Sequence, residues 1–285
     1  MARRATAVVG AILLTLALAA CGSDGDDRDE PPVRAEPAVE GTRLPIRTDE
    51  RTVAAMRTLI VRPRQHGPWP LVVWVHGPGA PPESYGGLLD EIAAVGNVVV
   101  APAMPGSAGA EAVLALPFQP GRVRQVIDAV TTGPYAIGAA DPEHIAVVGH
   151  GLGAMTALAE GFNSCCVDHR VDAVVAVAGG LAAFPGGSYN TGTIPVLLVH
   201  GARDDVVPYA GSGEALQAVG TSAYLLTVER GDHDGYLRSA GVVHDAVRDA
   251  ILAFLDATIG GSPQAGLADL NNAGSRPGVL LTTRG

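Results

Sequence analysis

Several segments of this sequence are apolar at every successive position, and they constrain the fold more than any other feature. Residues 98–100 and 174–177 are two such segments. A strand with one face in water alternates apolar and polar residues, so an uninterrupted apolar segment indicates a strand buried on both faces. Such strands occur in parallel sheets covered by helices. The sequence therefore predicts the α/β class, with a mainly parallel central sheet and helices on both faces.

Strand-like and helix-like segments alternate from about residue 52 onward, and turn residues separate them. Predicted strands cover residues 56–63, 71–77, 97–106, 144–149, 171–180, 194–204 and 223–231. Predicted helices cover residues 82–96, 122–132, 152 onward, 212–220 and 242–259. The tail from Gly260 is weakly patterned, and we expect it to be a short packed extension.

The first twenty residues have the pattern of a secretory signal peptide. Arg3 and Arg4 precede an apolar stretch that is too short to span a membrane stably. The stretch ends in Leu18-Ala19-Ala20-Cys21, which resembles a bacterial lipobox. In proteins with that motif the cysteine is lipidated and becomes the new N-terminus, so we expect a membrane anchor at Cys21. An ordinary signal peptide followed by a chance cysteine is the alternative.

The segment after Cys21 is acidic, contains proline and is nearly free of large apolar residues. Such a segment buries too little surface to offset its ordering entropy, so it should be a flexible tether. The predicted organisation is a signal peptide, a lipidated cysteine with its tether, an α/β domain, and a C-terminal extension: residues 1–20, 21–40, 41–259 and 260–285. The expected location is the cell envelope, on the extracytoplasmic side of a membrane.

Charge and cysteine content narrow the possible partners. The formal net charge is −10, which argues against a nucleic-acid partner. Only Cys165 and Cys166 remain after Cys21, and outside the cytoplasm they can oxidise to each other. Adjacent Cα atoms lie about 3.8 Å apart, below the usual disulfide range of roughly 4.4–6.8 Å. A disulfide and two free thiols therefore remain as alternatives, and the spacing suggests no metal site.

The stretch IAVVGHGLGAMTAL, residues 145–158, has the layout of a nucleophile elbow. That motif reads G-x-S-x-G, but here Gly151 stands at the serine position. Catalytic groups of such sheets gather at the carboxyl ends of strands, where Asp204 and His233 follow two further predicted strands. A histidine takes the proton of a serine hydroxyl, and a carboxylate orients that histidine. The sequence thus predicts the acid and the base of a triad whose nucleophile position is vacant.

Other histidines at strand ends have simpler interpretations. His76 and His200 close two predicted strands, and we expect them to be structural. His150 lies beside the elbow position and is expected to face away from the pocket.

Five motifs in this order resemble the chlorophyllase, dienelactone-hydrolase and polyester-hydrolase branch of the α/β-hydrolase superfamily. They are HGPGAPPESYGGL, VVVAPAMPGS, DPEHIAVVGHGLGA, HGARDDVVP and GDHDGYL, and together they cover roughly residues 52–258. The resemblance implies an α/β-hydrolase fold and a serine esterase that acts on carboxylic esters without a cofactor. It also implies Asp204 rather than Asp205 as the acid, and a small ester-like molecule as the ligand.

Two residues depart from the pattern of these families. Gly151 offers no side-chain nucleophile. Pro78 follows His-Gly in the oxyanion loop, where a backbone N–H is expected, and proline has none. Losing one such donor typically costs about 10²–10³ in turnover. Leu152 would supply the other donor, and Gly79 replaces Pro78 if the alignment slips by one residue. A glycine introduced deliberately at position 151 would leave Pro78 unexplained.

Three hypotheses follow. The first is an envelope-anchored lipoprotein of serine carboxylic-ester hydrolase lineage whose catalysis is impaired, a pseudoenzyme. The second is an active hydrolase. In one version, His233 and Asp204 activate a water molecule that attacks the ester; in another, a nearby hydroxyl such as that of Ser107 is the nucleophile. The third is a metal or ligand site on two loops, formed by Asp204, Asp205, Asp232, His233 and Asp234. The spacing of these residues matches no known ion-binding loop.

Overall fold

The structure is a computed structural model, and it describes residues 43–106, 109, 111–133, 136–189, 192–220 and 222–284. The predicted signal peptide, the predicted lipidation site Cys21, the predicted tether and Ser107 lie outside the described residues. Within the described residues, no helix is both long enough and apolar enough to cross a membrane.

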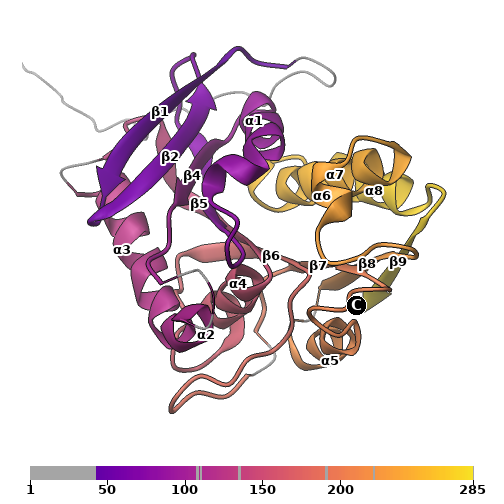
Figure 1. Cartoon of the computed structure of the whole chain (residues 1–285). Helices are drawn as coiled ribbons and strands as arrows, with labels where there is room; N and C mark the ends of the chain where they lie inside the picture. The colour runs from indigo at the N-terminus through magenta and orange to yellow at the C-terminus, as the bar shows by residue number, and fades with distance from the viewer. Residues whose placement is uncertain are drawn as a thin grey trace, which may run out of the picture. The chain divides into compact units, whose positions relative to one another are not determined.

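In the part of the chain that the structure describes, a nine-stranded sheet forms the centre of the domain (Figure 1). The strand order is β1-β2-β4-β3-β5-β6-β7-β8-β9, and the neighbours from β4 to β8 run parallel. The pairs β1–β2, β2–β4 and β8–β9 are antiparallel. The strands are β1 Ile46–Val53, β2 Met56–Pro63, β3 Trp69–Val75, β4 Val98–Pro102, β5 Ala140–His150, β6 Val171–Val177, β7 Val196–Gly201, β8 Ala223–Val228 and β9 Val279–Arg284.

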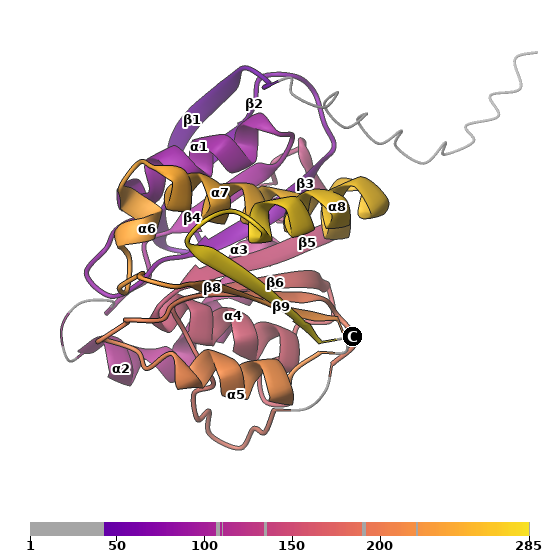
Figure 2. The same cartoon turned by 90° about the vertical axis from the view of Figure 1, so that its right-hand side faces the viewer.

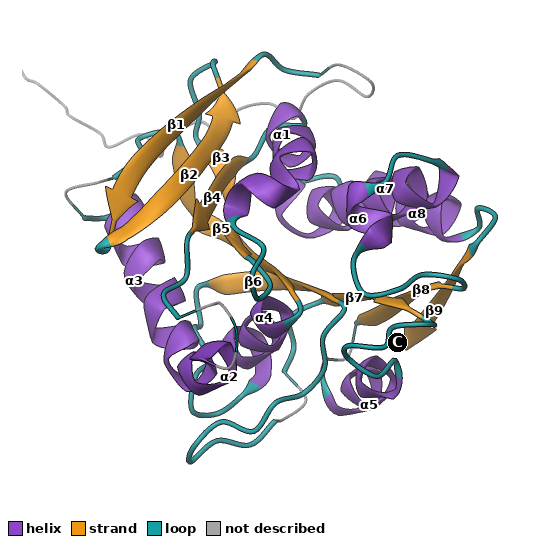
Figure 3. Ribbon diagram, in the orientation of Figure 1, coloured by secondary structure: helices purple, strands orange, loops and turns teal. Residues whose placement is uncertain are grey.

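Helices cover both faces of this sheet (Figure 3). One face packs against α1 Gly86–Ala94, α6 Gly235–Arg238, α7 Val242–Leu255 and α8 Pro263–Gly274. The other packs against α3 Gln119–Thr131, α4 Leu152–Phe162 and α5 Ala210–Ala218. Within β3, Val72 and Trp74 point to the first face, whereas Val73 points to the second. Every residue of β3 is buried, which explains its lack of apolar–polar alternation.

The predicted α/β-hydrolase fold is confirmed, and most predicted elements match within a few residues. The helix predicted over residues 82–96 comprises the 3₁₀ turn η1 Pro82–Tyr85 and α1, whereas the sequence did not predict β1, α2 Glu111–Ala115 or η2 Leu116–Phe118. The prediction for the tail needs correction. The segment from Gly260 does not merely pack as an extension: it forms α8 and then β9, which pairs with β8 and completes the sheet (Figure 2). An edge strand with polar residues on both faces, such as β9, carries little periodic signal.

Candidate active site

The elbow is a one-residue connection between β5 and α4. Gly151 has φ 58° and ψ −118°, in a region that residues with a Cβ adopt only under strain. Its N–H donates to the carbonyl oxygen of Val177 at 2.9 Å, which fixes the turn against β6. A Cβ on Gly153 would collide with the carbonyl group of Val75, so the first turn of α4 packs directly on β3. The backbone of a nucleophile elbow is therefore intact.

A histidine and a carboxylate meet at the neighbouring strand ends. His233, in the loop after β8, lies with Nδ1 2.8 Å from Oδ2 of Asp204, which follows β7. The other carboxylate oxygen of Asp204 accepts the N–H groups of Val206 and Val207, each at 2.8 Å. Burial alone would raise the pKa of Asp204, but the hydrogen bonds from His233 and from the two backbone groups outweigh it. The pKa of Asp204 therefore lies below its ordinary value, and the carboxylate is charged at neutral pH.

A second histidine contacts the same carboxylate. His200, which ends β7 and is fully buried, has Nε2 3.1 Å from Oδ2 of Asp204. Its Nδ1 lies 2.6 Å from Oγ of Ser212, and that hydroxyl donates to the carbonyl oxygen of Gly179. The sequence predicted a structural role for His200 but not its contact with Asp204. The spacing of four residues between His200 and Asp204 could have indicated that contact. His200 thus connects the acid to α5 and to the loop after β6.

Gly151 faces this histidine–carboxylate pair directly. A Cβ on Gly151 would lie 3.3 Å from Nε2 of His233 and 3.5 Å from Cδ of Pro78. Because Cδ of proline is bonded to the backbone nitrogen, Pro78 presents a methylene group to the elbow where another residue would present an N–H. Leu152 is the first residue of α4, so its N–H has no acceptor within the helix. Of the two expected oxyanion donors, the geometry leaves that of Leu152.

Tyr85 and His150 link three loops below the site. The N–H of Gly77 donates to the Tyr85 hydroxyl at 3.1 Å, and that hydroxyl lies 2.8 Å from Nδ1 of His150. Nε2 of His150 lies 3.2 Å from the backbone oxygen of His233. Burial, with the nearby charge of His233, lowers the pKa of His150 to about 4, so its ring is neutral. Both ring nitrogens are used, and His150 is not available as a nucleophile.

The remaining candidate residues do not join this site. Nε2 of His76 accepts the N–H of Met104 at 2.9 Å, which ties the end of β3 to the loop after β4. Asp234 pairs with Arg238, and Asp232 accepts the N–H of Gly235. Among the residues that the structure describes, no group of three or more His, Cys, Asp or Glu side chains is placed to hold a metal ion. Asp232 and Asp234 therefore serve a local turn and a helix end.

The two adjacent cysteines form a disulfide. Cys165 and Cys166 lie in the turn after α4, and their sulfur atoms are bonded. Of the two alternatives for this pair, the structure contains the oxidised one.

An elbow after β5, an acid after β7 and a histidine after β8 follow the chain order of α/β hydrolases, and the protein belongs to that superfamily. The chlorophyllase family model matches residues 35–200, and the model of TAP-like proteins, another α/β-hydrolase family, matches residues 157–258. The first match covers more than half of the sequence, and the chain is a member of the chlorophyllase family. No curated protein matches the chain.

Proposed function

We propose that this protein is an envelope-anchored lipoprotein of serine carboxylic-ester hydrolase lineage that no longer performs ordinary ester hydrolysis. One observation carries the proposal: the position from which a nucleophile would meet His233 belongs to a glycine. Glycine has no side-chain atom that can form an acyl-enzyme. Pro78 removes a second component, because it offers no N–H to a developing oxyanion. Loss of a triad nucleophile lowers turnover by about 10⁶-fold.

The remaining groups still suit an ester-like ligand. Nε2 of His233 points at the space above Gly151, and Leu152, the first residue of α4, has an N–H without an acceptor in the helix. A carbonyl oxygen of a ligand would accept that N–H, and a ligand hydroxyl or a water molecule would bond His233. We therefore propose that the site binds a small ester-like molecule without forming a covalent bond to it.

The retained His233–Asp204 hydrogen bond also supports the second hypothesis. In that mechanism His233 takes a proton from water as the water oxygen attacks the ester carbonyl, and Asp204 stabilises the imidazolium that forms. The proton then passes to the leaving alkoxide, which departs as an alcohol. This route needs no side chain at position 151.

Hydrolysis of p-nitrophenyl butyrate by the native protein and by His233→Ala distinguishes these functions. We expect both proteins to be equally slow, within about threefold, because His233 has no nucleophile to activate. His169→Ala is a matched control, since His169 is exposed and far along the sequence from the site residues. A native rate that falls 100-fold or more in His233→Ala, but not in His169→Ala, would establish the water mechanism instead.

The envelope anchor is a separate part of the proposal. It rests on Leu18-Ala19-Ala20-Cys21 and on the acidic segment that follows. Expressed in a bacterium, the native chain should sediment with the membrane fraction and incorporate labelled palmitate. Cys21→Ser should lose the label and shift to the soluble fraction, while Cys165→Ser should keep the label. Equal labelling of native protein and Cys21→Ser would refute lipidation at this cysteine.

A further inference from the structure

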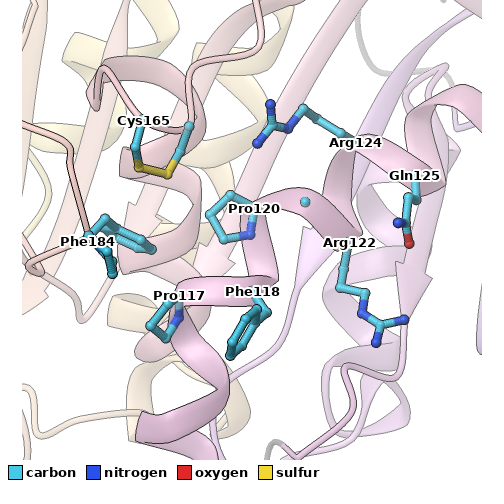
Figure 4. Close-up of a pocket in the computed structure, with 11 residues that line it drawn as sticks. Pro117, Phe118, Pro120, Arg122, Arg124, Gln125, Cys165 and Phe184 are labelled. Atoms are coloured by element: carbon cyan, nitrogen blue, oxygen red, sulfur yellow. A yellow bond between two sulfur atoms is a disulfide. The ribbon is translucent and has the colours of Figure 1, made fainter.

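A cavity of about 680 Å³ opens on the side of the domain that carries α3 and α4 (Figure 4). Its walls come from η2, the start of α3, the Cys165–Cys166 turn and the loop after β6. This volume falls within the range of small-molecule sites, roughly 300–1,000 Å³. Gly151, Asp204 and His233 do not line it, so the cavity is distinct from the candidate active site.

Flat apolar groups form much of the cavity wall. Phe118 and Phe184 present aromatic rings, and the disulfide lies beside Phe184 in Figure 4. Phe118 is 72% exposed, which is unusual for a residue of its size and leaves its ring in water at the cavity. The other apolar residues of the wall are prolines, which are conformationally stiff: Pro117, Pro120 and Pro185. The wall therefore suits an aromatic or aliphatic ligand body.

The charged residues in the wall are all positive. Arg122 and Arg124 line the cavity with Gln125, and no acid does, although the whole chain has 29 acidic and 19 basic residues. Within the described part of the chain, Arg122 makes no ion pair or hydrogen bond. An unpaired guanidinium group beside apolar walls favours a ligand that carries a negative charge.

The nearby Glu160 does not offset the positive charge of Arg124. Its Nε lies 4.0 Å from a carboxyl oxygen of Glu160 and has no hydrogen-bond partner. Glu160 is fully buried, and burial raises its pKa to about 9 despite the nearby charge of Arg124. The Glu160 carboxyl is therefore protonated at pH 7 and brings no negative charge to the Arg124 guanidinium group.

We propose that this cavity binds a small amphipathic carboxylate. Its apolar body packs against Phe118, Phe184 and the disulfide, and its carboxylate receives hydrogen bonds from Arg122 and Arg124. Planar guanidinium groups match a carboxylate in both shape and charge. The inference does not depend on the proposed function, because binding here requires no chemistry at Gly151.

Isothermal titration calorimetry with 4-phenylbutyrate tests this site on the full-length protein. The neutral amide, 4-phenylbutyramide, has the same apolar body and isolates the contribution of the charge. We expect Arg122→Gln/Arg124→Gln to weaken phenylbutyrate binding at least tenfold while leaving amide binding unchanged. Phe118→Ala should weaken the binding of both ligands. Because the Phe118 ring is exposed, its removal takes no packing from the core, and we expect the variant to fold as the native protein does.

The matched control is Arg51→Gln/Arg203→Gln, which removes two exposed arginines that do not line the cavity. It should bind both ligands as the native protein does. The proposal is overturned if the native protein binds neither ligand at millimolar concentration, or if both double variants weaken phenylbutyrate equally. The second result would indicate a general effect of net charge rather than a site.

Discussion

Gly151→Ser is expected to raise the rate of p-nitrophenyl butyrate hydrolysis about 10³–10⁴-fold above the native rate. The added Cβ lies 3.3 Å from Nε2 of His233, so the serine hydroxyl is within reach of the base after a shift of a few tenths of an ångström. Restoring a nucleophile is worth about 10⁶-fold in an intact triad. The missing N–H at Pro78 withholds about 10²–10³ of that gain.

Three companion variants make this result interpretable. Gly151→Ala adds the same backbone strain without a hydroxyl and should stay at the native rate. Gly151→Ser/His233→Ala should lose the gain, and Gly151→Ser/Pro78→Ser should add about 10²-fold by restoring a donor. Serine and alanine at position 151 should each lower the free energy of unfolding by about 1–3 kcal/mol, because φ is 58°. A folded serine variant no faster than the alanine variant would show that the pocket cannot position an ester.

The second large effect concerns Glu160, whose buried carboxyl oxygens make no hydrogen bond. We expect Glu160→Gln to raise the free energy of unfolding by about 3 kcal/mol at pH 7. In the folded protein burial raises the pKa to about 9, whereas the unfolded chain has the ordinary value of 4.5. Folding therefore takes up a proton between these values, and each pH unit above 4.5 costs about 1.4 kcal/mol.

The pH dependence of stability provides the measurement. We follow the free energy of unfolding of the native protein by chemical denaturation at different pH values. The contribution of Glu160 to that free energy should be highest below pH 4.5 and should fall as the pH rises toward 9. In Glu160→Gln that decline should disappear. Glu143→Gln is the control, because Glu143 is exposed and should leave the native pH profile unchanged. If the free energy of unfolding depends on pH in the same way in the native protein and in Glu160→Gln, then ionisation of the Glu160 carboxyl does not destabilise the fold, and the prediction is wrong.

The fold could be predicted because short segments of the sequence carry the pattern that indicates it. Continuous apolar segments such as that of β6 have one favourable environment, a sheet covered on both faces. The same reasoning fails at the edges of the sheet, where β1 and β9 keep polar residues and show no clear period. Their pairing with β2 and β8 is decided by tertiary contacts, which no window of sequence contains.

The candidate site was predictable in part for a different reason. Strand ends are recognisable in the sequence, so Asp204 and His233 could be expected at one edge of the sheet. The contacts of Tyr85 with Gly77 and His150 could not, because they join residues up to 65 positions apart. Nor does the sequence place Arg122 and Arg124 beside Cys165, since the start of α3 and the turn after α4 meet only in the folded chain.

Asp204 accepts hydrogen bonds from its own loop and contacts His200 and His233, so this carboxylate joins the end of β7 and the loop after it to the loop after β8, whether or not an ester is hydrolysed. Gly151, in contrast, contributes no side-chain contact to the fold. The absence of a side chain at position 151 therefore removes no contact from the fold, whereas loss of the Asp204 carboxylate would break the contacts between these segments. The His233–Asp204 pair thus has a structural role of its own in this architecture, and its presence alone does not establish ester hydrolysis.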